Sequence, residues 1–414
     1  MQYGLIGEHL GHSYSCEIHE NIADYKYELK ELAPDELDAF LTEKDFIGIN
    51  VTIPYKQAVI PYLDEISDRA KAIGAVNTIV NRNGRLFGDN TDFAGMDALL
   101  KFIGINASGK KALILGTGGT SKTAKAVLEK NGAAEIYKVS RSGSEGALTY
   151  DEAIKEHSDA QIIINTTPAG MYPKTEGCPI DIRKFEKLEG VLDAVYNPLR
   201  SNFVLNAKES GIPAEGGLYM LSAQAVYASA VFLDKELDES LIEKAYRNVR
   251  GAKQNVVMVG MPTSGKTTVG RIIAEKLGKE FCDTDALFAE KAGMTANEYI
   301  RANGEAAFRA LESKVVAETA AAGGKVIATG GGVVLKAENV RALKRNGCIV
   351  FIDRSLENLQ ALSDRPLSSD KNALTEMFEY RHPIYINSAD ISVNGDLAPE
   401  AVAETIIKSL ALWK

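Results

Sequence analysis

The fold of the second half of the chain is decided by the stretch Asn255-Val256-Val257-Met258-Val259-Gly260-Met261-Pro262-Thr263-Ser264-Gly265-Lys266-Thr267-Thr268. An apolar run ends at Gly260, where the spacing G-x-x-x-x-G-K-[ST] begins, so the order predicts a buried strand, a phosphate loop and the first turn of a helix. Backbone N–H groups and the helix N-terminus bind phosphate oxygens, a lysine neutralises the β and γ phosphates, and a threonine hydroxyl suits Mg²⁺. The residues expected at the nucleotide are Gly260, Gly265, Lys266, Thr267 and Thr268.

Composition indicates a soluble protein of several folding units. The chain has 414 residues, 45% of them hydrophobic and 25% charged, which predicts two or three domains. We expect no membrane span, because the apolar runs have the length of strands, and no secretion signal precedes the first strand. Four cysteines lie far apart, which favours a reducing cytoplasm. A net charge of -9 argues against nucleic acid as the main partner.

The first half contains a βαβ pattern with a glycine-rich turn. Residues 111–115 and 135–139 read as strands, and Gly116, Gly118 and Gly119 open the helix between them. This arrangement is typical of a Rossmann-type dinucleotide site. Where an NAD-binding fold carries an acid, the chain has Ser140-Arg141-Ser142, which favours the 2′-phosphate of NADP.

Polar residues follow several other predicted strands of the first half. Ser13 and Ser15 either cap the helix expected from about Cys16 or receive a carboxylate. Asn50 and Thr52 lie on one side of an extended segment before Lys56, which predicts a polar pocket wall. Further amides and acids follow the next strands, at Asn77, Asn90 and Asp92, with Asp89 and Asp92 also possible helix caps.

Residues 1–250 resemble shikimate dehydrogenase along nearly their whole length. After the serine pair, the matching blocks are N-V-T-x-P-x-K at 50–56, G-A-V-N-T at 74–78, G-D-N-T-D at 88–92, I-N-T-T-P-x-G-M at 164–171, Y-N-P-L at 196–199 and M-L-x-x-Q-A at 220–225. The resemblance implies that Lys56 and Asp92 are the catalytic pair. It places around the substrate Ser13, Ser15, Asn50, Thr52, Asn77, Tyr196 and Gln224. It places around the NADP cofactor Gly116, Gly118, Gly119, Ser140, Arg141, Ser142, Thr166 and Gly217.

The chain departs from the family pattern at two positions of this half. Cys16 stands where the family usually has proline, which we expect to affect only the stiffness of the loop. Glu145 stands where a second basic residue often holds the 2′-phosphate, so Arg141 carries most of the expected preference for NADP.

Acids, arginines and glycines mark a second site after the phosphate loop. Asp283 and Asp285 follow a predicted strand, either as solvated acids that begin a helix or as a Mg²⁺ ligand and a partner of a substrate hydroxyl. Arg309 lies on a predicted helix and either pairs with a neighbouring acid or binds a ligand. Gly330-Gly331-Gly332 ends another strand, which indicates backbone packed close to a ligand.

The second half resembles shikimate kinase over essentially its full length. The resemblance assigns Lys266 and Thr267 to phosphate and Mg²⁺ and Asp283 to the metal. It implies that Asp285 acts on the substrate hydroxyl and that Arg365 belongs to a lid over the transferred phosphoryl group. The residues it places around shikimate are Asp285, Arg309, Gly331, Gly332 and Arg381. The lid segment, residues 359–369, is short and has one arginine near the R-P-L motif.

We therefore expect an α/β protein with two consecutive activities. Residues 1–250 should hold a substrate part (1–100 and 220–250) and a Rossmann-type part (101–219), and residues 254–414 a kinase of the nucleoside-monophosphate-kinase type. The first would reduce 3-dehydroshikimate with NADPH, and the second would phosphorylate shikimate with MgATP. Two alternatives stay open: an NAD-dependent quinate/shikimate dehydrogenase joined to a kinase, and a regulatory sensor of quinate or shikimate. The oligomeric state and any channelling of shikimate are not encoded in these patterns.

Overall fold

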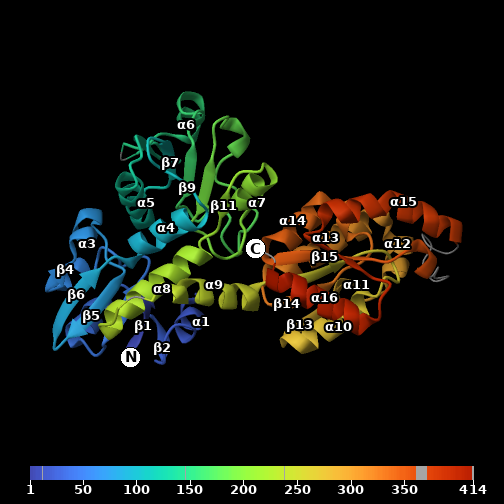
Figure 1. Ribbon diagram of the computed structural model, residues 1–414, viewed down its shortest axis with the longest axis horizontal. Helices are drawn as coiled ribbons and strands as arrows, with labels where there is room; N and C mark the ends of the chain where they lie inside the picture. The colour runs from blue at the N-terminus through green and yellow to red at the C-terminus, as the bar shows by residue number, and fades with distance from the viewer. Residues whose placement is uncertain (12, 145, 237, 360–370, 413–414) are drawn as a thin grey trace. The chain divides into compact units, whose positions relative to one another are not determined.

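A computed structural model describes residues 1–11, 13–144, 146–236, 238–359 and 371–412, and it divides into two compact units (Figure 1). The first unit comprises Met1–Arg250 and the second Gly251–Lys414. No described helix is both long and apolar enough to cross a membrane.

The first unit begins with a mixed sheet of six strands, in the order β2-β1-β3-β5-β6-β4. β3 is parallel to β1 and antiparallel to β5, which is antiparallel to β6. The strands are β1 (Tyr3–Gly7), β2 (Tyr27–Glu31), β3 (Gly48–Val51), β4 (Glu65–Ile66), β5 (Thr78–Arg82) and β6 (Arg85–Asp89). The helices of this part are α1 (Ser15–Glu20), α2 (Leu37–Glu43), the 3-10 turn η1 (Ile60–Tyr62), α3 (Asp68–Ile73), α4 (Thr91–Phe102), α8 (Leu218–Leu233) and α9 (Ser240–Lys253).

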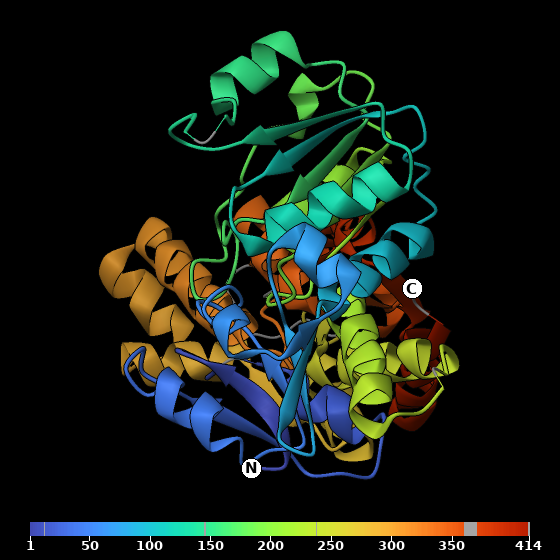
Figure 2. The same cartoon turned by 90° about the vertical axis from the view of Figure 1, so that its left-hand side faces the viewer.

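A parallel sheet of five strands forms the rest of this unit, in the order β11-β10-β9-β7-β8. Its elements are β7 (Lys111–Leu115), α5 (Gly119–Lys130), β8 (Glu135–Val139), α6 (Tyr150–Glu156), β9 (Ile162–Asn165), η2 (Ile182–Lys184), β10 (Gly190–Asp193), α7 (Asn202–Glu209) and β11 (Ala214–Glu215). Apolar residues of α5 pack on one face of the sheet, and those of α6 and α7 pack on the other. Figure 2 shows α5, coloured teal, lying across the strands. This layering confirms the predicted Rossmann-type fold.

The second unit is a parallel sheet in the order β13-β14-β12-β15-β16, covered on both faces. Its elements are β12 (Asn255–Val259), α10 (Lys266–Leu277), β13 (Glu280–Asp283), α11 (Thr284–Ala292), α12 (Ala296–Asn303), α13 (Glu305–Ala321), β14 (Lys325–Ala328), η3 (Val333–Leu335), α14 (Ala337–Asn346), β15 (Gly347–Asp353), η4 (Leu356–Asn358), α15 (Lys371–Ser388), β16 (Ile391–Asn394) and α16 (Pro399–Leu412).

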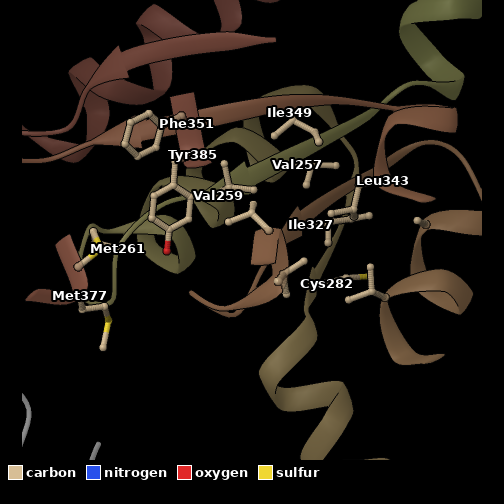
Figure 3. Close-up of a cluster of buried hydrophobic side chains, with 14 of the residues drawn as sticks. Val257, Val259, Met261, Cys282, Ile327, Leu343, Ile349, Phe351, Met377 and Tyr385 are labelled. Atoms are coloured by element: carbon tan, nitrogen blue, oxygen red, sulfur yellow. The ribbon is translucent and has the colours of Figure 1, made fainter. Parts of the chain in front are cut away.

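The apolar run before the phosphate loop is continuous because both faces of β12 are buried. Val257 and Val259 point into a core formed with α13, α14 and α15, where Tyr385 stacks on Phe351 (Figure 3). Val256 and Met258 point to the opposite face, which α10 and α16 cover. The alternation of side chains along a strand thus uses every residue of the run.

The last turn of α9 belongs to the second unit. The Nζ atom of Lys279 donates hydrogen bonds to three main-chain carbonyls, those of Gly251 (2.8 Å), Ala252 (2.9 Å) and Gln254 (2.9 Å). Burial lowers the pKa of Lys279 to about 8. Helix α9 continues past residue 250, the predicted end of the first domain, to Lys253, and Lys279 binds the carbonyls of Gly251 and Ala252 in its last turn.

Some predicted helix boundaries differ from the structure for local reasons. The first helix begins at Ser15 with Tyr14 at its N-cap, and the hydroxyl of Ser13 accepts from the first main-chain amide of the helix, that of Ser15, at 3.2 Å. Asn90 caps α4, so Asp89 and Asp92 do not. Asp283 caps α11 by accepting hydrogen bonds from the amides of Asp285 and Ala286, which is the helix-starting role considered for the acid pair.

Helix α4 crosses helix α8 closely at Gly95, which predicts a strong effect of a single methyl group. A Cβ atom at Gly95 would lie 2.6 Å from the carbonyl oxygen of Met220 and 3.0 Å from the Cβ of Gln224. We expect Gly95→Ala to lower the stability of the first unit by about 1–3 kcal/mol through overpacking, measured by thermal unfolding followed by circular dichroism. Gly251→Ala is the matched control: it lies in α9 with no atom within 4 Å of the new methyl group, and it should be neutral or stabilising. Equal melting curves for the parent and Gly95→Ala would contradict the close crossing.

Candidate active sites

A lysine and an aspartate from different segments meet in the first unit. Lys56 lies in the loop after β3, and Asp92 lies in the first turn of α4. The Nζ atom of Lys56 donates to Oδ2 of Asp92 at 2.6 Å, and both side chains are largely shielded from water. A held ammonium beside a carboxylate can stabilise a developing oxyanion and deliver a proton to it.

Close to this pair, a buried network joins the amides predicted around the substrate. The register of the sheet sets Asn50 beside Thr78, and Thr78 beside Asp89. The amide nitrogen of Asn50 donates to the carbonyl of Asn77 and to the hydroxyl of Thr78, each at 3.1 Å. Its amide oxygen accepts from the hydroxyl of Tyr27 at 2.7 Å. Asn50 therefore braces the buried network, with both of its amide hydrogens already donated.

The network continues to α4 and α8 through Asn77. Its amide oxygen accepts from the main-chain amide of Thr91 at 2.7 Å, and its amide nitrogen donates to Oε1 of Gln224 at 3.3 Å. The hydroxyl of Thr91 also lies 3.3 Å from the same oxygen of Gln224. Since Thr91 precedes Asp92, these bonds fix the start of the helix that carries the acid.

The other substrate residues predicted in this unit lie at the edges of the network. The hydroxyl of Ser13 donates to that of Ser15 at 3.1 Å, and Ser15 is buried. Between them, Tyr14 packs edge-on against Tyr196 with ring centroids 5.3 Å apart. Thr52 lies half-buried before Lys56, with its amide bonded to the carbonyl of Ile6.

The glycine-rich turn between β7 and α5 has room for a dinucleotide. A methyl group added at Gly118 or Gly119 would meet no atom within 4 Å, so the turn is open where a pyrophosphate would approach the helix N-terminus. The hydroxyl oxygen of Ser140 is buried and has no hydrogen-bond partner among the described residues. Such an orphaned group at the end of β8 fits a polar part of the cofactor.

The remaining residues predicted at the cofactor surround this turn. Arg141 and Ser142 are exposed, and the hydroxyl of Ser142 lies 2.8 Å from that of Ser144. Thr166 donates its hydroxyl to the carbonyl of Leu115 at 2.7 Å, and Gly217 precedes α8 as its N-cap. Glu145 lies outside the described residues.

The phosphate loop of the second unit has its lysine turned inward. The Nζ atom of Lys266 donates to the carbonyls of Gly260 (3.0 Å) and Met261 (2.8 Å), within the loop itself. The hydroxyl oxygen of Ser264 is buried and lacks a partner among the described residues, which fits a phosphate acceptor. The hydroxyl of Thr267 donates to Oδ2 of Asp283 at 3.0 Å. These two oxygen groups suit Mg²⁺, with phosphate and water completing its shell, and Thr268 beside them is exposed.

The triple-glycine segment lies among the acid and arginines predicted around it. A Cβ atom at Gly330 would lie 2.5 Å from Oδ1 of Asp285, and one at Gly332 would lie 2.4 Å from Nη1 of Arg309. The Nη1 atom of Arg381 donates to the carbonyl of Gly331 at 3.2 Å. Side chains at Gly330 and Gly332 would displace the carboxylate of Asp285 and the guanidinium of Arg309 from these positions. Arg365 and the short lid segment lie outside the described residues.

Several residues of both sites were missed by the sequence patterns. Tyr27, Thr78 and Thr91 complete the buried network of the first unit, and the two threonines lie within the G-A-V-N-T and G-D-N-T-D blocks. In the second unit, Glu312 receives a hydrogen bond from Arg309 at 2.8 Å, and burial raises the pKa of its carboxyl. Tyr385 donates to the carbonyl of Gly331. Only the spacing from Arg309 to Glu312, one helical turn, carries a local signal.

Comparisons with known proteins match both units. The shikimate dehydrogenase substrate binding domain family matches residues 5–79, and the shikimate kinase family matches residues 262–411. A shikimate dehydrogenase (NADP(+)) of Clostridium perfringens is 36% identical, over 60% of this chain and 98% of its own length. The crystal structure of shikimate dehydrogenase 1 from Peptoclostridium difficile has a TM-score of 0.56 at 34% identity, covering 60% of this chain and 98% of that one. The enzyme of Thermus thermophilus, in complex with NADP(H) and shikimate, has a TM-score of 0.54 at 30% identity, covering 60% of this chain and 99% of that one.

The exposed arginine after β8 predicts a selective loss of cofactor binding. Arg141→Ala should weaken NADPH binding about tenfold and leave NADH binding nearly unchanged, because only NADPH carries a 2′-phosphate. Titration of the enhancement of nucleotide fluorescence measures both constants. The control is Arg183→Ala, which removes an exposed arginine of η2, between β9 and β10 of the same unit. Parallel losses for both cofactors would refute the assignment of Arg141.

Proposed function

The chain belongs to the shikimate dehydrogenase family and carries a shikimate kinase domain after it, and we propose that it catalyses two consecutive steps of one pathway. The first unit reduces 3-dehydroshikimate to shikimate with NADPH, and the second transfers the γ-phosphoryl group of MgATP to the 3-hydroxyl of shikimate. The observation that carries this proposal is the pair of sites in one chain. The ion pair of Lys56 and Asp92 borders a buried amide network in one unit, and a phosphate loop accompanies Arg309 and Arg381 in the other.

Reduction of a ring ketone requires a hydride, which NADPH supplies when bound, and a proton for the oxygen. Lys56 donates a hydrogen bond to the carbonyl oxygen and then its proton, as negative charge develops there. Asp92 keeps the ammonium in place through the hydrogen bond that its Oδ2 atom accepts from Lys56. The proton lost by Lys56 is regained from solvent.

The chain binds the substrate through neutral donors on the opposite side of the pocket. The hydroxyls of Ser13 and Ser15 receive the carboxylate, and Tyr196 lies beside that stretch. The Oε1 atom of Gln224 is held by Asn77 and Thr91, and its amide nitrogen donates one hydrogen to the carbonyl of Leu221 at 3.2 Å, so the second amide hydrogen serves a ring hydroxyl.

Phosphoryl transfer in the second unit depends on positioning and charge. Arg309 and Arg381 receive the carboxylate of shikimate, for which a planar guanidinium offers two parallel donors. Asp285 accepts the proton of the 3-hydroxyl. The oxygen of that hydroxyl forms a bond to the γ-phosphorus, while the bond between the γ-phosphorus and the oxygen of ADP breaks. Lys266 would neutralise the phosphates, and Thr267 and Asp283 would hold a Mg²⁺ ion, whose charge would favour transfer of the phosphoryl group. Arg365 is proposed to cover the phosphoryl group.

The two units correspond to two catalytic domains, residues 1–250 and 254–414, with the first divided into a substrate part and an NADP part. We place both reactions in the cytoplasm, where NADPH and ATP are available and where the four free cysteines stay reduced. The alternatives have less support. A sensor would not need the ion pair at Lys56 or the lysine of the phosphate loop, and an NAD-dependent quinate enzyme would not need Arg141.

Substitution of one lysine in each unit should separate the two activities. Lys56→Ala should reduce NADPH oxidation with 3-dehydroshikimate by about 10²–10⁴-fold and leave phosphorylation of added shikimate intact. Lys266→Ala should have the opposite effect. An absorbance assay for NADPH, followed by MgATP and chromatography of shikimate 3-phosphate, measures both steps. Each variant is the control for the other, and loss of both activities in a folded variant would refute two independent sites.

The proposed base of the second unit predicts a separation of rate from binding. Asp285→Asn should lower kcat of the kinase by about 10²-fold or more and change KM for ATP little, because the proposed role of Asp285 concerns shikimate and not ATP. Asp151→Asn, an exposed acid of the first unit, is the control. An unchanged kcat in Asp285→Asn would show that another group takes the proton.

A further inference from the structure

Asp193, at the end of β10, is a buried acid that the proposed reaction does not use. It lies inside the parallel sheet of the first unit, directly beside Asn165 of β9, and is 0% exposed. No lysine, arginine or histidine among the described residues forms an ion pair with it. Burial raises the pKa of its carboxyl to about 6, against the lowering effect of Ser201, Val195 and Asn165.

All the groups that face the carboxylate are neutral donors from three segments. Its Oδ1 atom accepts from the amide nitrogen of Asn165 (2.8 Å) and from the main-chain amide of Val195 (3.0 Å). Its Oδ2 atom accepts from the hydroxyl of Ser201, the residue that caps α7. One side chain therefore joins β9, the segment after β10 and the start of α7.

These bonds extend to the segment after β9. Because Asn165 gives its amide nitrogen to Asp193, its amide oxygen faces Thr167 and accepts from that residue's amide (3.0 Å) and hydroxyl (2.7 Å). The hydroxyl of Thr167 in turn accepts from the amide of Ala169 at 3.3 Å. The orientation of the Asn165 amide is thus set by Asp193, because the Oδ1 atom of its carboxylate can only accept a hydrogen bond and so binds the amide nitrogen of Asn165.

The segment after β10 is held in the same way. The amide of Val195 is fixed by Asp193, and Tyr196 follows immediately. The amide of Ala194 also donates to the carbonyl of Asn165 at 2.9 Å, so the two segments are tied through main chain and side chain together. Thr166, predicted at the cofactor, lies on one segment, and Tyr196, predicted at the substrate, lies on the other.

An unpaired charge in the interior costs stability, since desolvation is offset here only by neutral donors. An asparagine would keep most of these contacts without the charge. The presence of a carboxylate at this position is explained by what an amide cannot do, which is to accept from Val195, Asn165 and Ser201 at once.

We propose that Asp193 is a positioning residue of the dehydrogenase site. Its carboxylate holds the segments 166–171 and 194–201 together and so sets Thr166 against the cofactor and Tyr196 against the substrate. This inference rests on the proposed function of the first unit, whose site these two segments border.

The test compares Asp193→Asn with Asp97→Asn in the full chain. Asp97 is also buried, but it pairs with Lys101 and Lys130 and joins α4 to α5. At pH 7.5 we expect Asp193→Asn to melt at the same or a higher temperature than the parent, while KM for 3-dehydroshikimate and NADPH rises about fivefold, as a charge-assisted acceptor is lost. Asp97→Asn should melt at a lower temperature and keep both KM values.

The pH dependence gives a second readout that a structural role would not produce. Protonation of Asp193 makes the parent resemble the asparagine variant, because both side chains are then neutral. The pKa of Asp193 in the folded protein is raised to about 6, so this protonation occurs at a higher pH than in the unfolded chain. The two proteins should therefore converge in melting temperature and in kcat/KM as the pH falls from 7.5 to 5, and the advantage of the variant in melting temperature should grow as the pH rises.

The outcomes separate the inference from the proposed function. An active parent with a variant of unchanged KM values, or a variant whose only change is a lower melting temperature, overturns the positioning role. A parent that does not reduce 3-dehydroshikimate overturns the proposed function, and the inference with it. The inference is supported by a stable Asp193→Asn variant whose KM values exceed those of the parent at pH 7.5 and equal those of the parent at pH 5.

Discussion

Strands buried on both faces cannot carry polar side chains along their length, and the sites of this protein follow from that constraint. In the parallel sheet of the first unit, Leu115, Asn165 and Asp193 lie in register at the carboxyl ends of neighbouring strands. In the second unit, Asp283 lies in register with Ala328 at the corresponding edge, just before the triple glycine. Apolar sequence builds each sheet, and the last residue of a strand, with those that follow it, supplies the polar groups.

The mixed sheet solves the same problem in another way. Asn50 and Thr78 are buried within it, side by side on antiparallel strands, and they satisfy each other's hydrogen-bonding groups. A buried polar network of this kind is stable only when all its members are paired. That requirement explains why Tyr27, which contacts no proposed ligand, belongs to the structure of the pocket.

Local patterns in the sequence were sufficient wherever a function lies within a few residues. The phosphate loop and the dinucleotide turn were predicted from spacing, the two families were predicted from the resemblance of several motif blocks, and the comparisons confirm the families. The contacts of Tyr27 with Asn50, and of Asn77 with Gln224, join residues 23 and 147 positions apart, and no local period encodes them. The dual position of Asp283, as a helix cap and a neighbour of Thr267, also depends on two strands meeting in space. The roles of the individual site residues remain predictions.

The three carbonyls around Lys279 decide where the second unit can be separated from the first. A kinase that began at Gln254 would lack the last turn of α9. Lys279, which is half-buried, would then keep only the carbonyl of Gln254 of its three acceptors. The second unit therefore depends on residues 251–253, which are the last turn of a helix that begins in the first unit. A separated second unit would therefore have to keep residues 251–253 to supply two of the three acceptors of Lys279.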